Sequence, residues 1–229
     1  MNDLEDELSS ILDALGRNGL LKHLVLIGSW VMVVYEAYFR DSNYSPSIRT
    51  TDVDFLIPKR HPRIDGKKDV SRILEALGFS EVFSSDGWCT YHKPELHVEF
   101  LLPRIGPQSD DVVSIPSLGL NARPLRHLSL LADNIIAINF QGFDITVPHP
   151  AAYALQKLII SARRKISEKA QKDIDQAEAV LTVLKKRSDI ELLRTLFEQL
   201  TKKQRKAVLD SAKKRVFLDD VLKKLLENE

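Results

Sequence analysis

The composition and the apolar pattern of the chain change at Pro148-His149-Pro150. From Ala151 to Glu229 it contains neither glycine nor proline, and apolar residues recur at helical spacing. Glycine and proline are the residues that most often interrupt helices, so this stretch predicts a region of four or five helices. The residues before the change mix short apolar runs with turn residues. We therefore expect two domains, at residues 1–148 and 149–229.

The first part carries the patterns of both helices and strands. Helical spacing is found at 3–16, 30–39 and 67–77, and strand-like runs are found at 24–27, 51–57, 80–83, 88–92 and 96–102. Two further runs, 134–140 and 143–147, flank Gln141-Gly142 and predict a hairpin. Residues 40–50 predict a loop, and residues 103–126, with four prolines, predict a connection of unassigned structure. The expected fold class is α+β.

Composition favours a reducing, aqueous compartment. The chain has a single cysteine, Cys89, which excludes an internal disulfide framework. The first residues are acidic where a signal peptide would be basic. The apolar run from Leu24 to Tyr35 is interrupted by Gly28-Ser29 and is too short to cross a bilayer. We expect a soluble, cytoplasmic protein without a membrane partner.

The most informative segment for chemistry is Thr51-Asp52-Val53-Asp54-Phe55. In a strand, alternation directs Asp52 and Asp54 to one face, and Val53 and Phe55 to the other. Two neighbouring carboxylates repel each other, and a divalent cation removes that cost. Mg²⁺ prefers one or two protein carboxylates together with phosphate oxygens and water. The alternative is a strand end that exposes two aspartates to water.

A Gly-Ser turn precedes this segment. Leu24–Ile27 predicts a buried strand that ends at Gly28-Ser29, with a helix directly after it. Backbone N–H groups at a helix N-terminus bind phosphate, and glycine lets a ligand approach the backbone closely. Most Gly-Ser pairs are only turns. Together with the aspartates 24 positions later, however, the turn predicts a site for a metal-bound triphosphate.

A third carboxylate lies in His97-Val98-Glu99-Phe100-Leu101. Alternation places His97, Glu99 and Leu101 on one face, so Glu99 faces the aspartates if the two strands are neighbours. Three carboxylates can hold two metal ions, and one carboxylate can serve as the base that activates a hydroxyl. The alternative is a solvent-facing strand residue. Asp86 and Glu95 are weaker substitutes because they lie in apparent turns.

Several motifs in combination resemble a bacterial family with a nucleotidyltransferase fold and an Asp-Phe-Leu motif. The motifs are Ile27-Gly28-Ser29, Tyr35-Glu36-Ala37, Thr51-Asp52-Val53-Asp54-Phe55-Leu56, His149-Pro150, Ala154–Leu158, Arg163-Arg164, Lys172-Asp173 and Gln176–Ala179. The resemblance covers roughly residues 20–185. It implies a polymerase-β-like core, which is a mixed sheet with flanking helices, followed by a C-terminal helical region. More distantly, the chain is similar to nucleotidyltransferase toxins of abortive-infection toxin–antitoxin systems.

The resemblance implies a two-metal transfer of a nucleoside monophosphate from an NTP to a hydroxyl, with release of pyrophosphate. Asp52, Asp54 and Glu99 are then the catalytic and metal-binding residues, and the cofactor is Mg²⁺, with Mn²⁺ as a substitute. The nucleotide-binding set is Gly28, Ser29, Lys157, Arg164 and Asp173. In this set Ser29 contacts the β- and γ-phosphates, Lys157 neutralises the triphosphate and Asp173 orients Lys157 or an arginine. The chain departs from the minimal family pattern in the long gap between Ser29 and Asp52 and in having Glu99 as third acid.

The residues themselves leave the roles of Lys157 and Asp173 open. Lys157, Ser161 and Arg164 lie on adjacent helical turns and form either one cationic strip or a solvated helix face. Asp173 follows Lys169 by four residues, which is also typical of a surface ion pair.

Charge is divided unevenly along the chain. Residues 151–229 carry 19 Lys+Arg and 12 Asp+Glu, a net charge of +7, whereas the other residues carry 14 and 20, a net charge of −6. The basic clusters are Lys185-Lys186-Arg187, Lys202-Lys203 with Arg205-Lys206, Lys213-Lys214-Arg215 and Lys223-Lys224. They bind an RNA or protein acceptor or are solvated helix surfaces, and we expect no aromatic platform among them.

The leading hypothesis is therefore an Mg²⁺-dependent nucleotidyltransferase that acts on RNA, a protein or a small hydroxylated molecule. The alternatives are a nucleotide- or RNA-binding module with the same fold but no turnover, and the toxin of a toxin–antitoxin pair.

Overall fold

The structure is a computed structural model that describes residues 3–40, 44, 51–59, 62–104, 106, 111–184 and 187–227. Most of the loop predicted at 40–50, and Lys185 and Lys186 of one basic cluster, lie outside these residues. Two compact units emerge from the contacts. The first consists of the described parts of Met1–Ala37 and Ile48–Pro148, and the second of those of Tyr38–Ser47 and His149–Glu229.

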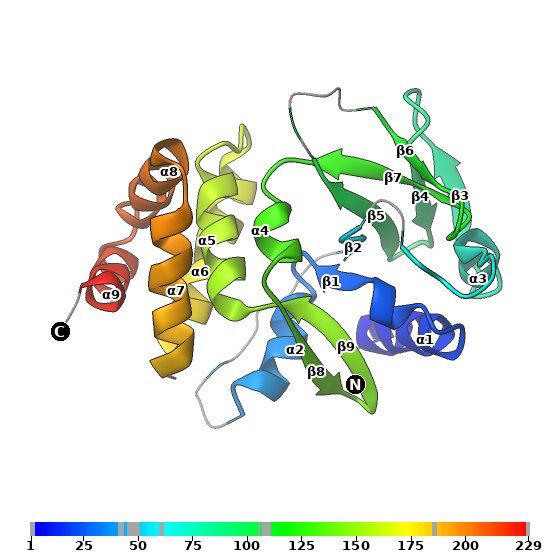
Figure 1. Ribbon diagram of the computed structural model, residues 1–229, viewed down its shortest axis with the longest axis horizontal. Coiled ribbons are helices and arrows are strands. Elements are labelled where there is room, and N and C mark those ends of the chain that lie inside the picture. The colour runs from blue at the N-terminus through cyan, green and yellow to red at the C-terminus, as the bar shows by residue number, and fades with distance from the viewer. Residues whose placement is uncertain are drawn as a thin grey trace. The chain divides into compact units, whose positions relative to one another are not determined.

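The first unit is built on a mixed sheet (Figure 1). Within the described residues its strands are β1 (Val25–Ile27), β2 (Asp52–Leu56), β3 (Ser80–Phe83), β4 (Cys89–His92), β5 (His97–Pro103), β6 (Val113–Ile115) and β7 (Leu120–Leu125). The main order is β1-β2-β5-β4-β3, and β7 pairs with both β5 and β6. Strands β2 and β5 are parallel neighbours, whereas β1 is antiparallel to β2 and β4 is antiparallel to β5.

One face of this sheet is apolar because the strands alternate as predicted. Val53, Phe55, Val98 and Phe100 are buried, and the rings of Phe55 and Phe100 stack with their centroids 5.7 Å apart. The hydroxyl of Tyr91, on the same face, forms a 2.7 Å hydrogen bond with Ser71 of α3. Helix α3 therefore packs on the apolar face.

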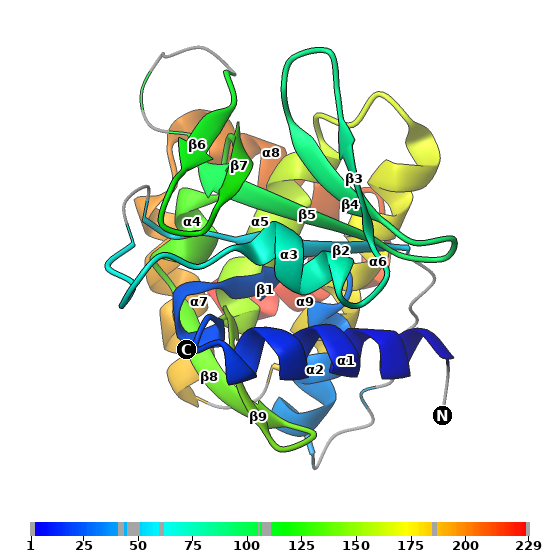
Figure 2. The same ribbon diagram turned by 90° about the vertical axis from the view of Figure 1, so that its right-hand side faces the viewer.

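Helices and a separate ribbon complete the first unit. They are α1 (Asp3–Arg17), the 3₁₀ turn η1 (Leu21–His23), α2 (Val31–Tyr38), α3 (Val70–Glu75), α4 (Ser129–Ala132) and the antiparallel pair β8 (Ile135–Phe140) and β9 (Phe143–Pro148). Helix α1 contacts α3 (Figure 2), and β9 contacts β1. Helix α3 is shorter than the 67–77 predicted, because Asp69 accepts a hydrogen bond from the Arg72 backbone N–H and caps the helix there.

The stretch at 103–126 contains β6 and β7, which the sequence left unassigned. Pro124 lies inside β7, where its ring normally argues against a strand. The pairing of β7 with β6 ends at Ala122, and Pro124 is paired only with Leu102 of β5. Proline has no backbone N–H to donate. It is tolerated at this position because the strand is paired on one side only.

The second unit is helical throughout its C-terminal part. Its helices are α5 (Pro150–Ser161), α6 (Ser167–Val183), α7 (Arg187–Gln199), α8 (Lys202–Ala212) and α9 (Val216–Leu226), which agrees with the four or five predicted. Helix α5 is buried nearly all round and contacts α6, α7 and α8, as Figure 1 shows. The predicted α+β class with a C-terminal helical region is confirmed. Among the described residues, no helix has the length and apolar character needed to span a membrane.

Cys89 lies in the interior of the first unit, and its surroundings lead to a prediction about its reactivity. Its thiol is buried and donates a 3.2 Å hydrogen bond to Oε1 of Glu81. Burial, followed by the hydrogen bond to Glu81, raises the thiol pKa to about 12. Because the thiolate is the reactive form, we expect the folded protein to resist labelling by Ellman's reagent at pH 8 and urea-unfolded protein to react rapidly. Equal labelling rates in the two states would contradict this burial.

Candidate active site

The face of the sheet opposite α3 carries the predicted carboxylates. Asp52 begins β2 with 53% of its side chain exposed, and Asp54 is half-buried two residues later. Val53, between them, is fully buried on the other face. The aspartates therefore share one face of a strand whose opposite side is held by the core.

Glu99 lies directly opposite Asp54. The parallel register of β2 and β5 pairs Asp52 with His97, and Asp54 with Glu99. Asp54 and Glu99 are both half-buried. Neighbouring strands lie about 4.8 Å apart, so the side chains of the paired Asp54 and Glu99 are neighbours on one face of the sheet.

The polar face continues onto β4 through Thr90 and His92, which were not among the predicted site residues. Thr90 is paired with Glu99, and His92 is paired with His97. The rings of His92 and His97 stack with centroids 4.1 Å apart. Burial, and secondarily His97, lowers the pKa of His92 below its usual range, while Asp52 acts in the opposite direction. Alternation along 90–92 and 97–99 was the only sequence signal for this cluster, and it could not reveal which strands are neighbours.

Gly28 lies against the Asp54 carboxylate. It follows β1, whose last residue, Ile27, is paired with Asp54. A Cβ atom at position 28 would lie 2.1 Å from Oδ2 and 3.1 Å from Cγ of Asp54. Gly28 also has φ of +73°, which L side chains rarely adopt. Glycine is therefore required here both by its backbone conformation and by the space that the Asp54 side chain fills.

Ser29 connects this glycine to helix α2. Its side chain is largely buried, at 8% exposure, and its carbonyl accepts a 3.1 Å hydrogen bond from the Met32 backbone N–H. Helix α2 begins two residues later, at Val31. The strand, turn and helix predicted around Gly28-Ser29 are thus present beside Asp54.

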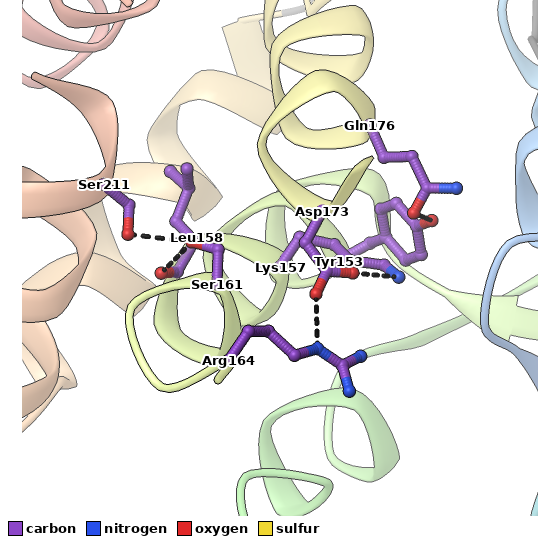
Figure 3. Close-up of polar contacts among 8 residues, drawn as sticks. All are labelled: Tyr153, Lys157, Leu158, Ser161, Arg164, Asp173, Gln176 and Ser211. Carbon is purple, nitrogen blue, oxygen red and sulfur yellow. Dashed lines mark hydrogen bonds and ion pairs between the residues drawn. The ribbon is translucent and has the colours of Figure 1, made fainter. Parts of the chain in front are cut away.

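Lys157, Arg164 and Asp173 meet within the second unit (Figure 3). Nζ of Lys157 donates to Oδ1 of Asp173, and Nε of Arg164 donates to Oδ2, each at 2.9 Å. Lys157 and Asp173 are buried, with 6% and 3% exposed, whereas 42% of the Arg164 side chain is exposed. The alternatives of a solvated face for Lys157 and a surface pair of Asp173 with Lys169 are therefore wrong.

Two further side chains surround this ion-pair cluster. The Lys157 ammonium lies 5.3 Å from the centroid of the Tyr153 ring, and the Tyr153 hydroxyl donates to Oε1 of Gln176. Nε2 of Gln176 is buried and has no hydrogen-bond partner in the described part of the chain. The cluster of one carboxylate and two cations therefore has a net positive charge. Its exposed member is Arg164.

The carboxylates lie in the first unit, and the Lys157–Arg164–Asp173 cluster lies in the second. No group of three or more His, Cys, Asp or Glu side chains is already arranged to hold a metal ion within the residues that the structure describes. The hollow lined by Glu81, Phe83, Cys89 and Asn121 is not lined by Asp52, Asp54 or Glu99. Its Glu81, Phe83 and Cys89 belong to the face on which α3 packs.

Comparison with known proteins agrees with this arrangement of strands and turns. A family described as nucleotidyltransferase matches residues 6–215, which is nearly the whole chain. The chain belongs to this family. The resemblance inferred from the motifs is thereby confirmed, although the roles of single residues are not. Among curated proteins, no sequence matches this nucleotidyltransferase-family chain.

Two solved structures share the fold. An antigenic nucleotidyltransferase-like protein from Paracoccidioides brasiliensis is 16% identical with a TM-score of 0.54, over 95% of this chain and 91% of that chain. ANT(2″)-Ia in complex with adenylyl-2″-tobramycin is 11% identical with a TM-score of 0.50, over 86% of this chain and 99% of that chain. At these identities the likeness shows the fold alone, and it confirms the predicted nucleotidyltransferase core with its helical region.

We expect Gly28→Ala to destabilise the protein and displace the Asp54 carboxylate. Gly19→Ala is a matched control, because Gly19 has φ of +70° but a Cβ added there would meet no atom within 4 Å. The control therefore introduces only backbone strain, which costs about 1–2 kcal/mol. Rotation of the Asp54 carboxyl group cannot relieve the contact with its Cγ, so Gly28→Ala should cost clearly more in urea unfolding. Equal losses for the two variants would show that Gly28 is needed only for its backbone conformation.

Proposed function

We propose that this chain is a metal-dependent nucleotidyltransferase that transfers a nucleoside monophosphate from an NTP to a hydroxyl group and releases pyrophosphate. The observation that carries the proposal is the alignment of Asp54 with Glu99 on adjacent parallel strands, with Gly28 against Asp54. Membership of the nucleotidyltransferase family supports the reaction class. We also propose that residues 1–148 form the nucleotidyltransferase domain and residues 149–229 a helical domain.

Asp52, Asp54 and Glu99 would hold the two metal ions of the proposed reaction. The donor set consists of carboxylate oxygens, which suit a hard cation, so we propose Mg²⁺ with Mn²⁺ as a substitute. Mg²⁺ takes one or two protein carboxylates and completes its shell with phosphate oxygens and water, so the facing pair of Asp54 and Glu99 fits it. When bound, such a cation supplies positive charge to the triphosphate and lowers the pKa of an attacking hydroxyl.

The protein's own groups would position the nucleotide. The Gly28-Ser29 turn offers a side-chain hydroxyl and backbone N–H groups to the β- and γ-phosphates. Glu99 or a neighbouring carboxylate would accept the proton of the acceptor hydroxyl.

In the second unit, we propose Lys157, Arg164 and Asp173 as nucleotide-binding residues, with Asp173 holding the two cations in place. Arg164 is the better candidate for direct phosphate contact, because it is half-exposed and uses only Nε toward Asp173 in the contacts described. Lys157 is buried against the same carboxylate and would act mainly by holding Asp173 in place.

For the acceptor, we propose single-stranded RNA held by an exposed stripe of the C-terminal helices. Lys202, Lys206, Leu209 and Lys213 follow one another at three- or four-residue spacing along α8, and all are exposed. The opposite stripe, which includes Val208 and Ala212, is fully buried. Residues 202–217 contain seven Lys or Arg and one acidic residue.

Apolar side chains accompany the basic residues, Leu209 on the stripe itself and Val216 and Phe217 at the start of α9. Leu209, Val216 and Phe217 are 37%, 80% and 56% exposed, next to Lys213, Lys214 and Arg215. Phe217, at the start of α9, is a single exposed ring beside a basic cluster rather than an aromatic platform interleaved with the clusters. A basic stripe with an exposed ring suits single-stranded nucleic acid, in which the backbone is anionic and the bases stack. A protein remains the second acceptor class, and a small hydroxylated molecule, such as the tobramycin moiety in the ANT(2″)-Ia complex, the third.

Asp54→Asn should abolish the transfer and preserve the fold. The assay incubates the protein with α-labelled NTPs and a whole-cell extract and then separates RNA, protein and small molecules. We expect Asp54→Asn to reduce the Mg²⁺-dependent labelling at least about 100-fold. Asp144→Asn, at an exposed strand position, is the matched control and should label like wild type. Equal labelling by wild type and Asp54→Asn would refute the catalytic assignment. Tight NTP binding that is indifferent to Mg²⁺, without pyrophosphate release, would favour a binding module instead, and growth arrest on expression would indicate a toxin.

The acceptor surface is tested by binding of a fluorescein-labelled, unstructured RNA 16-mer. Reversal of charge in Lys213→Glu/Lys214→Glu should weaken binding and reduce the salt slope by about 1.4, because two phosphate contacts are lost. Phe217→Ala should weaken binding by about 1–3 kcal/mol if a base stacks on the ring. Lys223→Glu/Lys224→Glu changes the charge equally on α9 and should have a smaller effect. Equal weakening by both double variants would show that total charge, rather than this stripe, attracts the RNA.

A further inference from the structure

Two histidines extend the carboxylate face in a way that the proposed reaction has not used. Strand pairing places three residues in one row across the sheet: His92 of β4, His97 of β5 and Asp52 of β2. The adjacent row consists of Thr90, Glu99 and Asp54. Both histidines therefore lie on the face that carries all three carboxylates.

The row is held together by successive polar contacts. Oγ1 of Thr90 lies 2.7 Å from Nε2 of His92, a hydrogen bond that ties the His92 ring to its own strand. The His92 and His97 rings are nearly parallel, at 25°, with centroids 4.1 Å apart. Nδ1 of His97 lies 3.5 Å from Oδ1 of Asp52, which is longer than a standard hydrogen bond but places the ring nitrogen beside the carboxylate.

The two aspartates are constrained by different means. Asp54 is half-buried, and its carboxyl group fills the space beside Gly28. Asp52 is the first residue of β2 and its side chain is 53% exposed, so packing restricts it less. A fixed, polar ring beside it would limit the orientations that its carboxylate can adopt.

We propose that His97, buttressed by His92 and Thr90, is a positioning residue for the Asp52 carboxylate. The inference rests on the proposed function, in which Asp52 binds a metal ion. Groups that orient metal-ligating carboxylates from the outer shell change metal affinity or activity by about 10–100-fold when they are removed. Thr90, His92 and His97 lie in the right order to act in this way, from a β4 hydroxyl through two rings to the carboxylate.

Two substitutions at His97 separate ring stacking from polarity. His97→Phe keeps an aromatic ring against His92 and removes the nitrogen that faces Asp52. His97→Asn loses the ring but places an amide nitrogen close to the position of Nδ1. Thr90→Val tests the other end of the row, because it removes the hydroxyl that holds His92 with little change in shape.

The test is Mn²⁺ affinity in the presence of a non-hydrolysable NTP analogue, measured by electron paramagnetic resonance of free Mn²⁺. We expect His97→Phe to raise the dissociation constant about 10–100-fold, Thr90→Val to raise it less, and His97→Asn to restore most of the affinity. The turnover number of His97→Phe should recover toward the wild-type value as the Mn²⁺ concentration is raised.

Wild-type Mn²⁺ affinity in His97→Phe would overturn the positioning role, and so would an equal loss in His97→Phe and His97→Asn. If wild type transfers nucleotide and Asp54→Asn does not, such a result would refute the histidine inference alone. Absence of both Mn²⁺ binding and transfer in wild type would refute the proposed function and the inference together.

Discussion

The parallel pairing of β2 with β5 is the constraint on which the rest of the candidate site depends. It sets Asp54 against Glu99 and Asp52 against His97, from segments more than forty residues apart in the chain. Two carboxylates that face each other across adjacent strands repel each other, and a bound cation would offset that repulsion. The register is not free to slip, because a shift of one residue would exchange the buried Val53 and Phe55 for the aspartates. The hydrophobic core therefore enforces the arrangement of acidic groups that a cation would favour.

Charge is handled in opposite ways in the two units. In the first, acidic groups are gathered on one polar face with two histidines beside them, which suits an external cation. In the second, the buried Asp173 is balanced by Lys157 and Arg164. Removal of a single partner from such a buried pair is costly because a charge is left without compensation. Among the described members of this cluster, Lys157 and Asp173 are buried, whereas the Arg164 side chain is partly exposed.

Particular elements show where sequence reasoning succeeded and where it stopped. The β2 and β5 strands and the Gly28 turn were predictable because apolar periodicity and turn residues are local signals. Strand β7 was not, because Pro124 argues against a strand unless one knows that only one side of it is paired. The residues alone also left the partner of Asp173 open. Lys169 is nearer in sequence, whereas Lys157 on α5 is nearer in space, and burial of α5 decided between them.

By itself, the sequence determined the α+β class, the change to helices after Pro150, the face on which Asp52 and Asp54 project, and the family resemblance. These properties follow from periodicity and from residue types at short spacing. Only the tertiary structure decided that Glu99 faces Asp54, that Gly28 contacts the Asp54 carboxylate, and that His92 and His97 stack beside Asp52. Strand order and register are long-range choices, made by the packing of a whole sheet, and no local pattern encodes which strands become neighbours.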